Sequence, residues 1–140
     1  MINPSAEVVE AFLAAWVAGD VEAAAARFAV DGIYALHLSA DLLQHGGEAV
    51  GRNRIAEALR YFGSRFDLLA SRPANLRFNE DIVRTQVEFR YRHRLSREVL
   101  SGRFRLVFRV RDRQIVRADE YHDRLKVEAF IRLFAHPSNA

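Results

Sequence analysis

Apolar residues recur every three or four positions through the N-terminal half of the chain. Val8, Phe12 and Trp16 would share one face of a helix that begins after Asn3, a good helix cap, and ends at Gly19. The same spacing and end signals predict, in chain order, a helix over residues 21–28, a short strand over 33–38, a long loop over 39–51 and a helix over 53–62.

The second half of the chain changes to a period of two. Between residues 83 and 93 apolar or aromatic side chains alternate with polar ones, most of them arginine, and the alternation returns between residues 104 and 110. This pattern is typical of strands with one buried and one exposed face. Strands are predicted over residues 66–78 with a break near Pro73, then 83–94, 103–111 and 115–124, and a closing helix carries Val127, Phe130, Ile131 and Phe134 before Pro137.

Helices followed by hairpin-connected strands predict an α+β fold. We expect one domain over residues 1–140, with the helices on one face of an antiparallel sheet. A sheet of this length must curl. A curved antiparallel β-sheet wrapped around the N-terminal helices would enclose a conical pocket, lined by the inward side chains of its strands.

Composition narrows the classes of protein that this chain can be. Of its 140 residues, 50% are hydrophobic and 28% charged, as in globular domains, and cysteine is absent, which excludes disulfide scaffolds and cysteine nucleophiles. The longest apolar run, residues 11–18, is too short to span a bilayer, and the N-terminus lacks the basic residues of a signal peptide. We therefore expect a cytoplasmic protein with no membrane contact.

Arginine supplies all but one of the 21 basic residues, and eleven arginines lie between Arg84 and Arg117. Strand parity puts most of these on the outer face of two neighbouring strands, where like charges repel and require counter-charges. A homodimer through this face, with arginines paired to the partner's carboxylates, is the expected arrangement. Binding of nucleic acid is disfavoured because aromatic residues for stacking are scarce there. Biased codon use is a further explanation of the arginine content.

Four stretches of the chain carry a resemblance to a known family. They are residues 16–23, 28–34, 51–55 and 115–123, and their order and spacing resemble the SnoaL-like and ketosteroid isomerase-like branch of the nuclear transport factor 2-like superfamily. The resemblance implies a cystatin-like curved sheet closed by helices, a deep apolar pocket and a homodimer. It implies no single activity, because this fold serves isomerases, polyketide cyclases, dehydratases, epoxide hydrolases and binding proteins.

The residues that would perform ketosteroid isomerisation are missing from this chain. That chemistry uses a carboxylate base, with a tyrosine and a neutral aspartic acid that donate to an oxyanion. When the resemblance is aligned at residues 19–20, the family's tyrosine corresponds to Phe12 of this chain, its base to Leu36 and its neutral aspartic acid to Leu106. None of these side chains can donate or accept a proton, so steroid isomerisation by that route is not expected.

The inward face of the last strand offers a different set of polar groups. Glu120 and His122 share that face by parity. Glu120 falls where the resemblance to limonene epoxide hydrolase places an acidic catalytic residue, although the accompanying Asp-x-Arg pattern has no counterpart. A buried carboxyl beside an imidazole suits acid–base chemistry, and a tyrosine can orient a substrate oxygen, so the expected catalytic residues are Glu120, His122 and Tyr34. The ligand-binding residues expected around them are Phe12, Trp16, Leu36, Phe62, Phe89, Tyr91, His93, Leu106, Phe108 and Ala118.

Three classes of function remain open at this point, and one of them is a structural dimer with a collapsed pocket. The pocket would bind a small hydrophobic molecule either for cofactor-independent isomerisation, cyclisation, dehydration or hydrolysis, or as a non-catalytic binding or accessory domain. An open cavity with Glu120 and His122 on its wall would favour the enzyme. Alternatively, Glu120 belongs to a structural ion pair, and His93, near a strand end, is solvated. Neither a metal nor a cofactor is expected, because the histidines are scattered and no phosphate-binding motif occurs.

Overall fold

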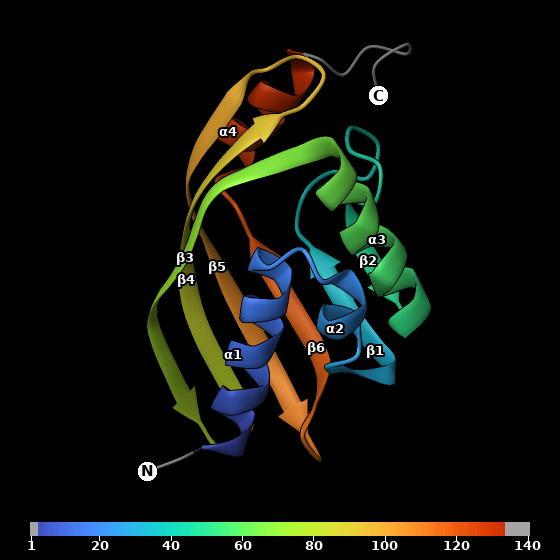
Figure 1. Ribbon diagram of the computed structural model, residues 1–140, viewed down its shortest axis with the longest axis vertical. Coiled ribbons are helices and arrows are strands. Elements are labelled where there is room, and N and C mark those ends of the chain that lie inside the picture. Colours follow the sequence, from blue (N-terminus) through green and yellow to red (C-terminus); the bar gives the residue numbers. More distant parts are fainter. Residues whose placement is uncertain (1–2, 134–140) are drawn as a thin grey trace.

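The computed structural model describes residues 3–133, in which six strands form one sheet in the order β2-β1-β6-β5-β4-β3. The elements are α1 (Pro4–Val17), α2 (Val21–Ala25), β1 (Phe28–Leu36), β2 (Gly47–Val50), α3 (Arg52–Arg65), β3 (Phe66–Asn79), β4 (Ile82–His93), β5 (Val99–Arg111), β6 (Gln114–Tyr121) and α4 (Arg124–Arg132). Both edges of the sheet contact α3, since β1 and β2 at one edge and β3 at the other pack against it. The sheet therefore curls around the helices, as Figure 1 shows and as the sequence predicts.

Helix starts follow the capping residues. Asn3 and Asp20 cap α1 and α2 as predicted, each accepting a hydrogen bond from the backbone N–H three residues on. Asp123 caps α4 in the same way, so this helix begins at Arg124, inside the segment predicted as the end of the last strand. Phe134 and Pro137, predicted for the end of the closing helix, lie outside the described residues.

The sheet departs from the prediction at the edge formed by β1 and β2. β1 begins at Phe28 rather than at residue 33, because the Arg27 carbonyl accepts a hydrogen bond from the N–H of Ile115 and brings the chain into the sheet earlier. β2 occupies part of the predicted loop. Only four residues long and half-exposed, it carries no apolar pattern. β1 also pairs with β6 in parallel, whereas the other neighbouring strands are antiparallel.

β3 is a single strand despite Pro73 near its middle. It lies at the edge of the sheet, where a residue without an N–H costs no ladder hydrogen bond if that side faces away from β4. Its pairing with β4 shifts register on both sides of the proline, between Leu68 and Ala70 and between Ala74 and Arg77. The strand is therefore not broken at Pro73 as predicted, and the irregularity takes the form of two register shifts within one strand.

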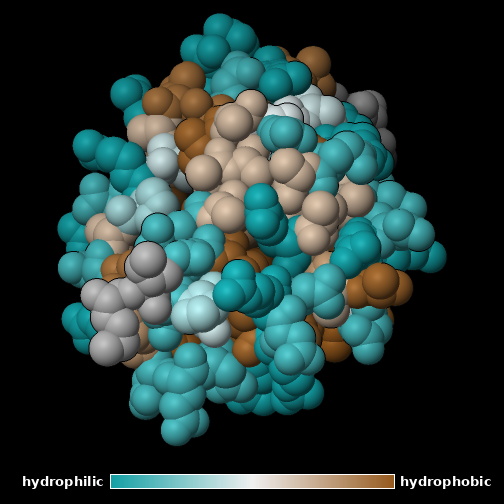
Figure 2. Space-filling view, turned by 60° about the horizontal axis from the view of Figure 1, so that its bottom comes forward, coloured by the Kyte–Doolittle hydropathy of each residue, from teal (hydrophilic) through white to brown (hydrophobic). Residues whose placement is uncertain are grey.

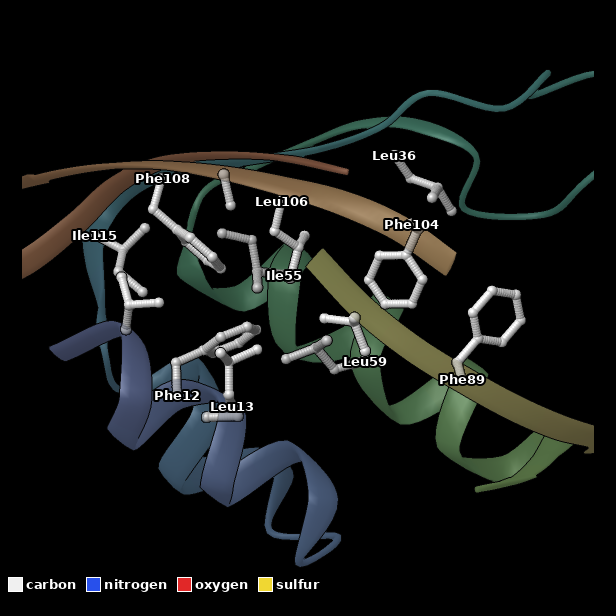
Figure 3. Close-up of a cluster of buried hydrophobic side chains, with 14 of the residues drawn as sticks. Phe12, Leu13, Leu36, Ile55, Leu59, Phe89, Phe104, Leu106, Phe108 and Ile115 are labelled. Atoms are coloured by element: carbon white, nitrogen blue, oxygen red, sulfur yellow. The ribbon is translucent and has the colours of Figure 1, made fainter. Parts of the chain in front are cut away.

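The predicted alternation on β4 and β5 is confirmed. Val83, Val87 and Phe89 are buried on the inner face of β4, whereas Arg84 and Arg90 are exposed on the outer face. On β5 the inward row runs Phe108, Leu106, Phe104, and Figure 3 shows this row leading from the packed core beside Ile115 towards Phe89. α1 and α3 close the core from the other side with Phe12, Leu13, Ile55 and Leu59 (Figure 3).

The apolar side chains of residues 3–133 lie mainly in this interior. Seen from the end that is lowest in Figure 1, the surface is largely hydrophilic, with apolar side chains visible in patches (Figure 2). Among residues 3–133 no helix combines the length and the apolar character needed to cross a bilayer.

Phe108 is expected to be a main support of the core. It is fully buried and packs edge-on against Phe12, with ring centroids 5.8 Å apart. Phe108→Ala should lower the free energy of unfolding by about 3–5 kcal/mol, because it leaves a cavity. Phe78→Ala, at a position 48% exposed on the same sheet, is the matched control and should cost far less. Equal losses in urea titrations of the two variants would show that the inner face is wrongly assigned.

Candidate functional site

An apolar cavity of about 120 Å³ lies between the inner face of the sheet and the helices. All six strands, α1, α3, α4 and the segment between β1 and β2 contribute to its wall. Most of the lining is aliphatic or aromatic, and its polar side chains include Tyr34, His45, Ser71, Tyr91, Glu120 and His122. Engineered cavities of about 150 Å³ hold one benzene ring, so this space suits a single ring or a branched alkyl group.

Most of the residues that the sequence nominates for the pocket do line this cavity. Phe108 and Ala118 lie on the same inner face but are fully buried in the core, away from the lining. The nominated residues on the wall are Phe12, Trp16, Tyr34, Leu36, Phe62, Phe89, Tyr91, Leu106, Glu120 and His122.

His93 is inward by parity yet lies outside the cavity lining. At the end of β4, its Nδ1 accepts a hydrogen bond from the N–H of Ser96 at 3.2 Å and lies 2.9 Å from the Ser96 hydroxyl. Burial, with the charge of Arg65, lowers the pKa of His93, which favours the neutral ring that this contact requires. The His93 side chain therefore belongs to the β4–β5 turn. Inward parity predicted correctly on which face of the sheet His93 lies, but parity does not say how far along the strand the cavity extends.

One chain of hydrogen bonds crosses the cavity wall and joins the three proposed catalytic residues. The Tyr34 hydroxyl donates to Oε1 of Glu120, and Nε2 of His122 lies 2.5 Å from Oε2 of the same carboxyl. The parallel pairing of β1 with β6, in which Leu36 lies beside Glu120, brings Tyr34 within reach. Among residues 3–133 there is no group of three or more side chains suited to hold a metal ion.

Two tyrosines next to Glu120 are held in their protonated form. Burial, and after it the negative charge of Glu120, raises the pKa of Tyr34 well above its ordinary value. Burial and the same carboxylate also raise the pKa of Tyr91, and interactions with the side chains of Ser71 and Trp16 oppose this only in part. Both phenols therefore remain hydrogen-bond donors at any physiological pH.

Aromatic rings enclose the imidazole of His122. Its ring centroid lies 4.7 Å from that of Phe104 and 5.7 Å from that of Phe89, and the side chain is only 7% exposed. Nε2 faces Glu120, whereas Nδ1 is buried without a hydrogen-bond partner in the described part of the chain. A protonated His122 would bury an unpaired N–H at this atom, which is costly, so the geometry favours the neutral ring with its hydrogen on Nε2.

Sequence reasoning missed a part of the wall that has no strand or helix period. The segment between β1 and β2 supplies Leu38, Leu43 and His45 to the lining. It is joined to α4, because the Glu128 carboxylate accepts a hydrogen bond from the Ser39 N–H at 3.1 Å. We call this contact the clasp. α4 is also attached to β5, because the Lys126 ammonium donates a hydrogen bond to the Ser101 carbonyl.

On the outer face, most of the carboxylates that could pair with the arginines already form ion pairs within the chain. Glu88 lies between Arg72 and Arg103, at 3.6 and 3.8 Å. Arg117 donates to Asp119, which also contacts His37 at 2.9 Å. The outward parity predicted for the arginines of β5 is confirmed, because Arg103, Arg105, Arg109 and Arg111 are all exposed.

Comparison with known proteins supports the fold. A model of the SnoaL-like domain family matches residues 9–118. No curated protein matches the chain. Solved structures at low sequence identity share its fold over nearly the whole length.

Three of these structures illustrate the range of sequence identities. A protein with a ketosteroid isomerase-like fold from Catenulispora acidiphila, in complex with trimethylamine, is 21% identical, with a TM-score of 0.76 over 92% of this chain and 95% of that one. TerC, co-crystallised with polyporic acid, is 18% identical, with a TM-score of 0.79 over 93% and 99%. An NTF2-like protein of unknown function from Burkholderia pseudomallei is 15% identical, with a TM-score of 0.81 over 94% and 98%.

The clasp is expected to weaken in acid. The Ser39 N–H, and after it the Arg124 guanidinium, hold the pKa of the Glu128 carboxyl below its ordinary value. A pKa lowered by folding stabilises the protein above the unfolded value of about 4.3, and this effect is lost as the pH falls through the folded value. Glu128→Gln should therefore lower the Tm at pH 7, with the two curves converging near pH 3. Glu57→Gln, at an exposed helix position, is the control and should follow the wild type throughout. A Glu128→Gln effect that is independent of pH would contradict the assignment.

Proposed function

This chain belongs to the SnoaL-like domain family, and we propose that it is an enzyme that moves a proton on a small, mostly apolar molecule without a cofactor. The observation that carries the proposal is the hydrogen-bonded chain of Tyr34, Glu120 and His122 on the wall of the cavity. A purely structural ion pair would need no cavity beside it, and a simple apolar binding site would need no buried carboxylate, which is costly to desolvate.

Glu120 is the proposed base. Each carboxylate oxygen has two lone pairs, so Glu120 can accept a substrate proton while Tyr34 and His122 still hold it in place. The proton taken from one atom of the substrate is then returned to another, as in an isomerisation, or to a leaving oxygen, as in a dehydration. Tyr34 acts as a positioning residue, because its hydroxyl is directed at Glu120.

Tyr91 takes over the role that the sequence alone suggested for Tyr34. Tyr91 belongs to the same wall, and its raised pKa keeps its hydroxyl protonated. A neutral phenol of this kind can donate to a substrate oxygen as negative charge develops there. The apolar remainder of the substrate would lie against Phe62 and the other aromatic rings of the lining.

The comparisons support a ligand of modest size. Two of the similar structures hold small organic molecules, trimethylamine in one and polyporic acid in the other. In this chain the space of about 120 Å³ suits a substrate of one ring or two small fused rings, and a larger polycyclic one would require α4 or the segment between β1 and β2 to move. The competing function is that of a binding protein without chemistry.

Proton abstraction can be tested with a reporter. The compound 5-nitrobenzisoxazole loses its C3 proton to a base while its N–O bond breaks, and the phenolate formed is coloured. We expect Glu120→Gln, which keeps the shape of the side chain, to lower the turnover rate by about 10²–10⁴-fold. Glu57→Gln should leave the rate unchanged. Equal rates in wild type and Glu120→Gln would exclude Glu120 as the base, and binding without turnover in either protein would favour the binding function.

We also propose that two copies associate through the outer sheet face. Arg84, Arg90, Arg109 and Arg111 are exposed there, and within residues 3–133 none lies within ion-pair distance of a carboxylate. They could pair with carboxylates of a second copy that its own ion pairs do not occupy, such as the exposed Glu98. Sedimentation at micromolar concentration should report a dimer. The double variant Arg105→Glu/Arg109→Glu should dissociate it, whereas Arg54→Glu on α3 should not. A monomeric wild type would refute this arrangement.

A further inference from the structure

The cavity lining contains an acidic group and no permanent cation among the described residues. Glu120 is the one carboxyl group there, and no lysine or arginine lines the wall. Within residues 3–133, the imidazoles of His45 and His122 are the only lining groups that could supply positive charge. Of these two, His122 contacts Glu120 directly.

His122 does not supply that charge in the observed arrangement. Its Nε2 is paired with Glu120, and its buried Nδ1 has no acceptor within the described chain. An imidazolium would leave a charged N–H unsatisfied at Nδ1, and so would a neutral ring protonated on Nδ1, with the proton on Glu120. The neutral ring with hydrogen on Nε2 leaves only a bare lone pair. In that state the imidazole donates to Glu120 and brings no positive charge to it.

Aromatic rings next to the carboxylate add to the same field. Phe89 forms a continuous row with Tyr91 and Phe104, at centroid separations of 4.8 and 5.3 Å, and Trp16 shares the lining. The faces of such rings carry partial negative charge and attract cations, most strongly where water is excluded. A buried carboxylate beside aromatic faces favours a positively charged ligand over a neutral one of the same shape.

We propose that the cavity takes a small organic cation, an ammonium group with alkyl substituents, whose charge lies at Glu120 and whose alkyl groups pack against Phe89, Tyr91 and Phe104. The size agrees, because about 120 Å³ accommodates a trialkylammonium head group but not a long or polycyclic chain. This proposal rests on the proposed function in that both place the ligand in the same cavity. It adds the charge class of that ligand.

Choline and 3,3-dimethylbutan-1-ol make a matched pair of probes, because they have the same shape and differ in a nitrogen cation against a neutral carbon. Calorimetric titration of the wild-type protein should show choline binding at least about tenfold more tightly than the alcohol. Glu120→Gln should bring the two affinities together, whereas Glu57→Gln should preserve the difference. Choline should raise the Tm of the wild type more than the alcohol does.

Three results would overturn the proposal. They are equal or tighter binding of the alcohol to the wild type, no binding of choline up to about 10 mM, and a preference for choline that persists in folded Glu120→Gln. The comparison of the two probes on the wild type needs no variant, so it stands even if Glu120→Gln fails to fold. The 5-nitrobenzisoxazole reaction tests the proton transfer separately, so a failure of the cation proposal is distinguishable from a failure of the proposed function.

Discussion

The shared register of β4, β5 and β6 is the constraint on which both faces of the sheet depend. Thr85 lies opposite Leu106, and Leu106 lies opposite Glu120, so one row of inward positions crosses the three strands. A slip of one residue in β5 would turn its arginines into the interior and its phenylalanines into water. Because a buried unpaired guanidinium costs far more than a lost hydrogen bond, no such slip is tolerated, and the place of Glu120 in the cavity is fixed by the packing of its neighbours.

That same register forces a carboxyl group into an apolar interior, and the structure compensates locally. The Tyr34 hydroxyl donates to one oxygen of Glu120, and the His122 imidazole contacts the other. Both partners are neutral in the arrangement argued above, so they stabilise the carboxylate without cancelling its charge. The result is a fixed group that is oriented and still charged. Such a group is suited to act on a proton or a cation that enters the cavity, and a fully paired ion would not be.

The fold and the location of the site could be predicted from the sequence because both depend on periodic burial. Parity, together with the family resemblance, placed Glu120 and His122 on the inner face, and α1 and α3 followed from helical spacing. Contacts between distant segments could not be predicted in this way. The parallel pairing that brings Tyr34 to Glu120, and the clasp from Glu128 to the segment before β2, depend on the tertiary path of the chain. For the same reason the parity of His93 gave its face correctly and not its distance from the cavity.

The polar groups of this cavity also show how the fold and its chemistry separate. Phe12, Leu36 and Leu106, at positions where the family resemblance implies polar groups for steroid isomerisation, are apolar here and form wall. With those positions apolar, the polar side chains of the described lining come from other positions, among them Tyr34, Tyr91 and Glu120. Under the proposed function, the polar end of a ligand would lie at Glu120. The curved sheet sets the shape of the space, and the few positions that are polar decide which end of a molecule can react within it.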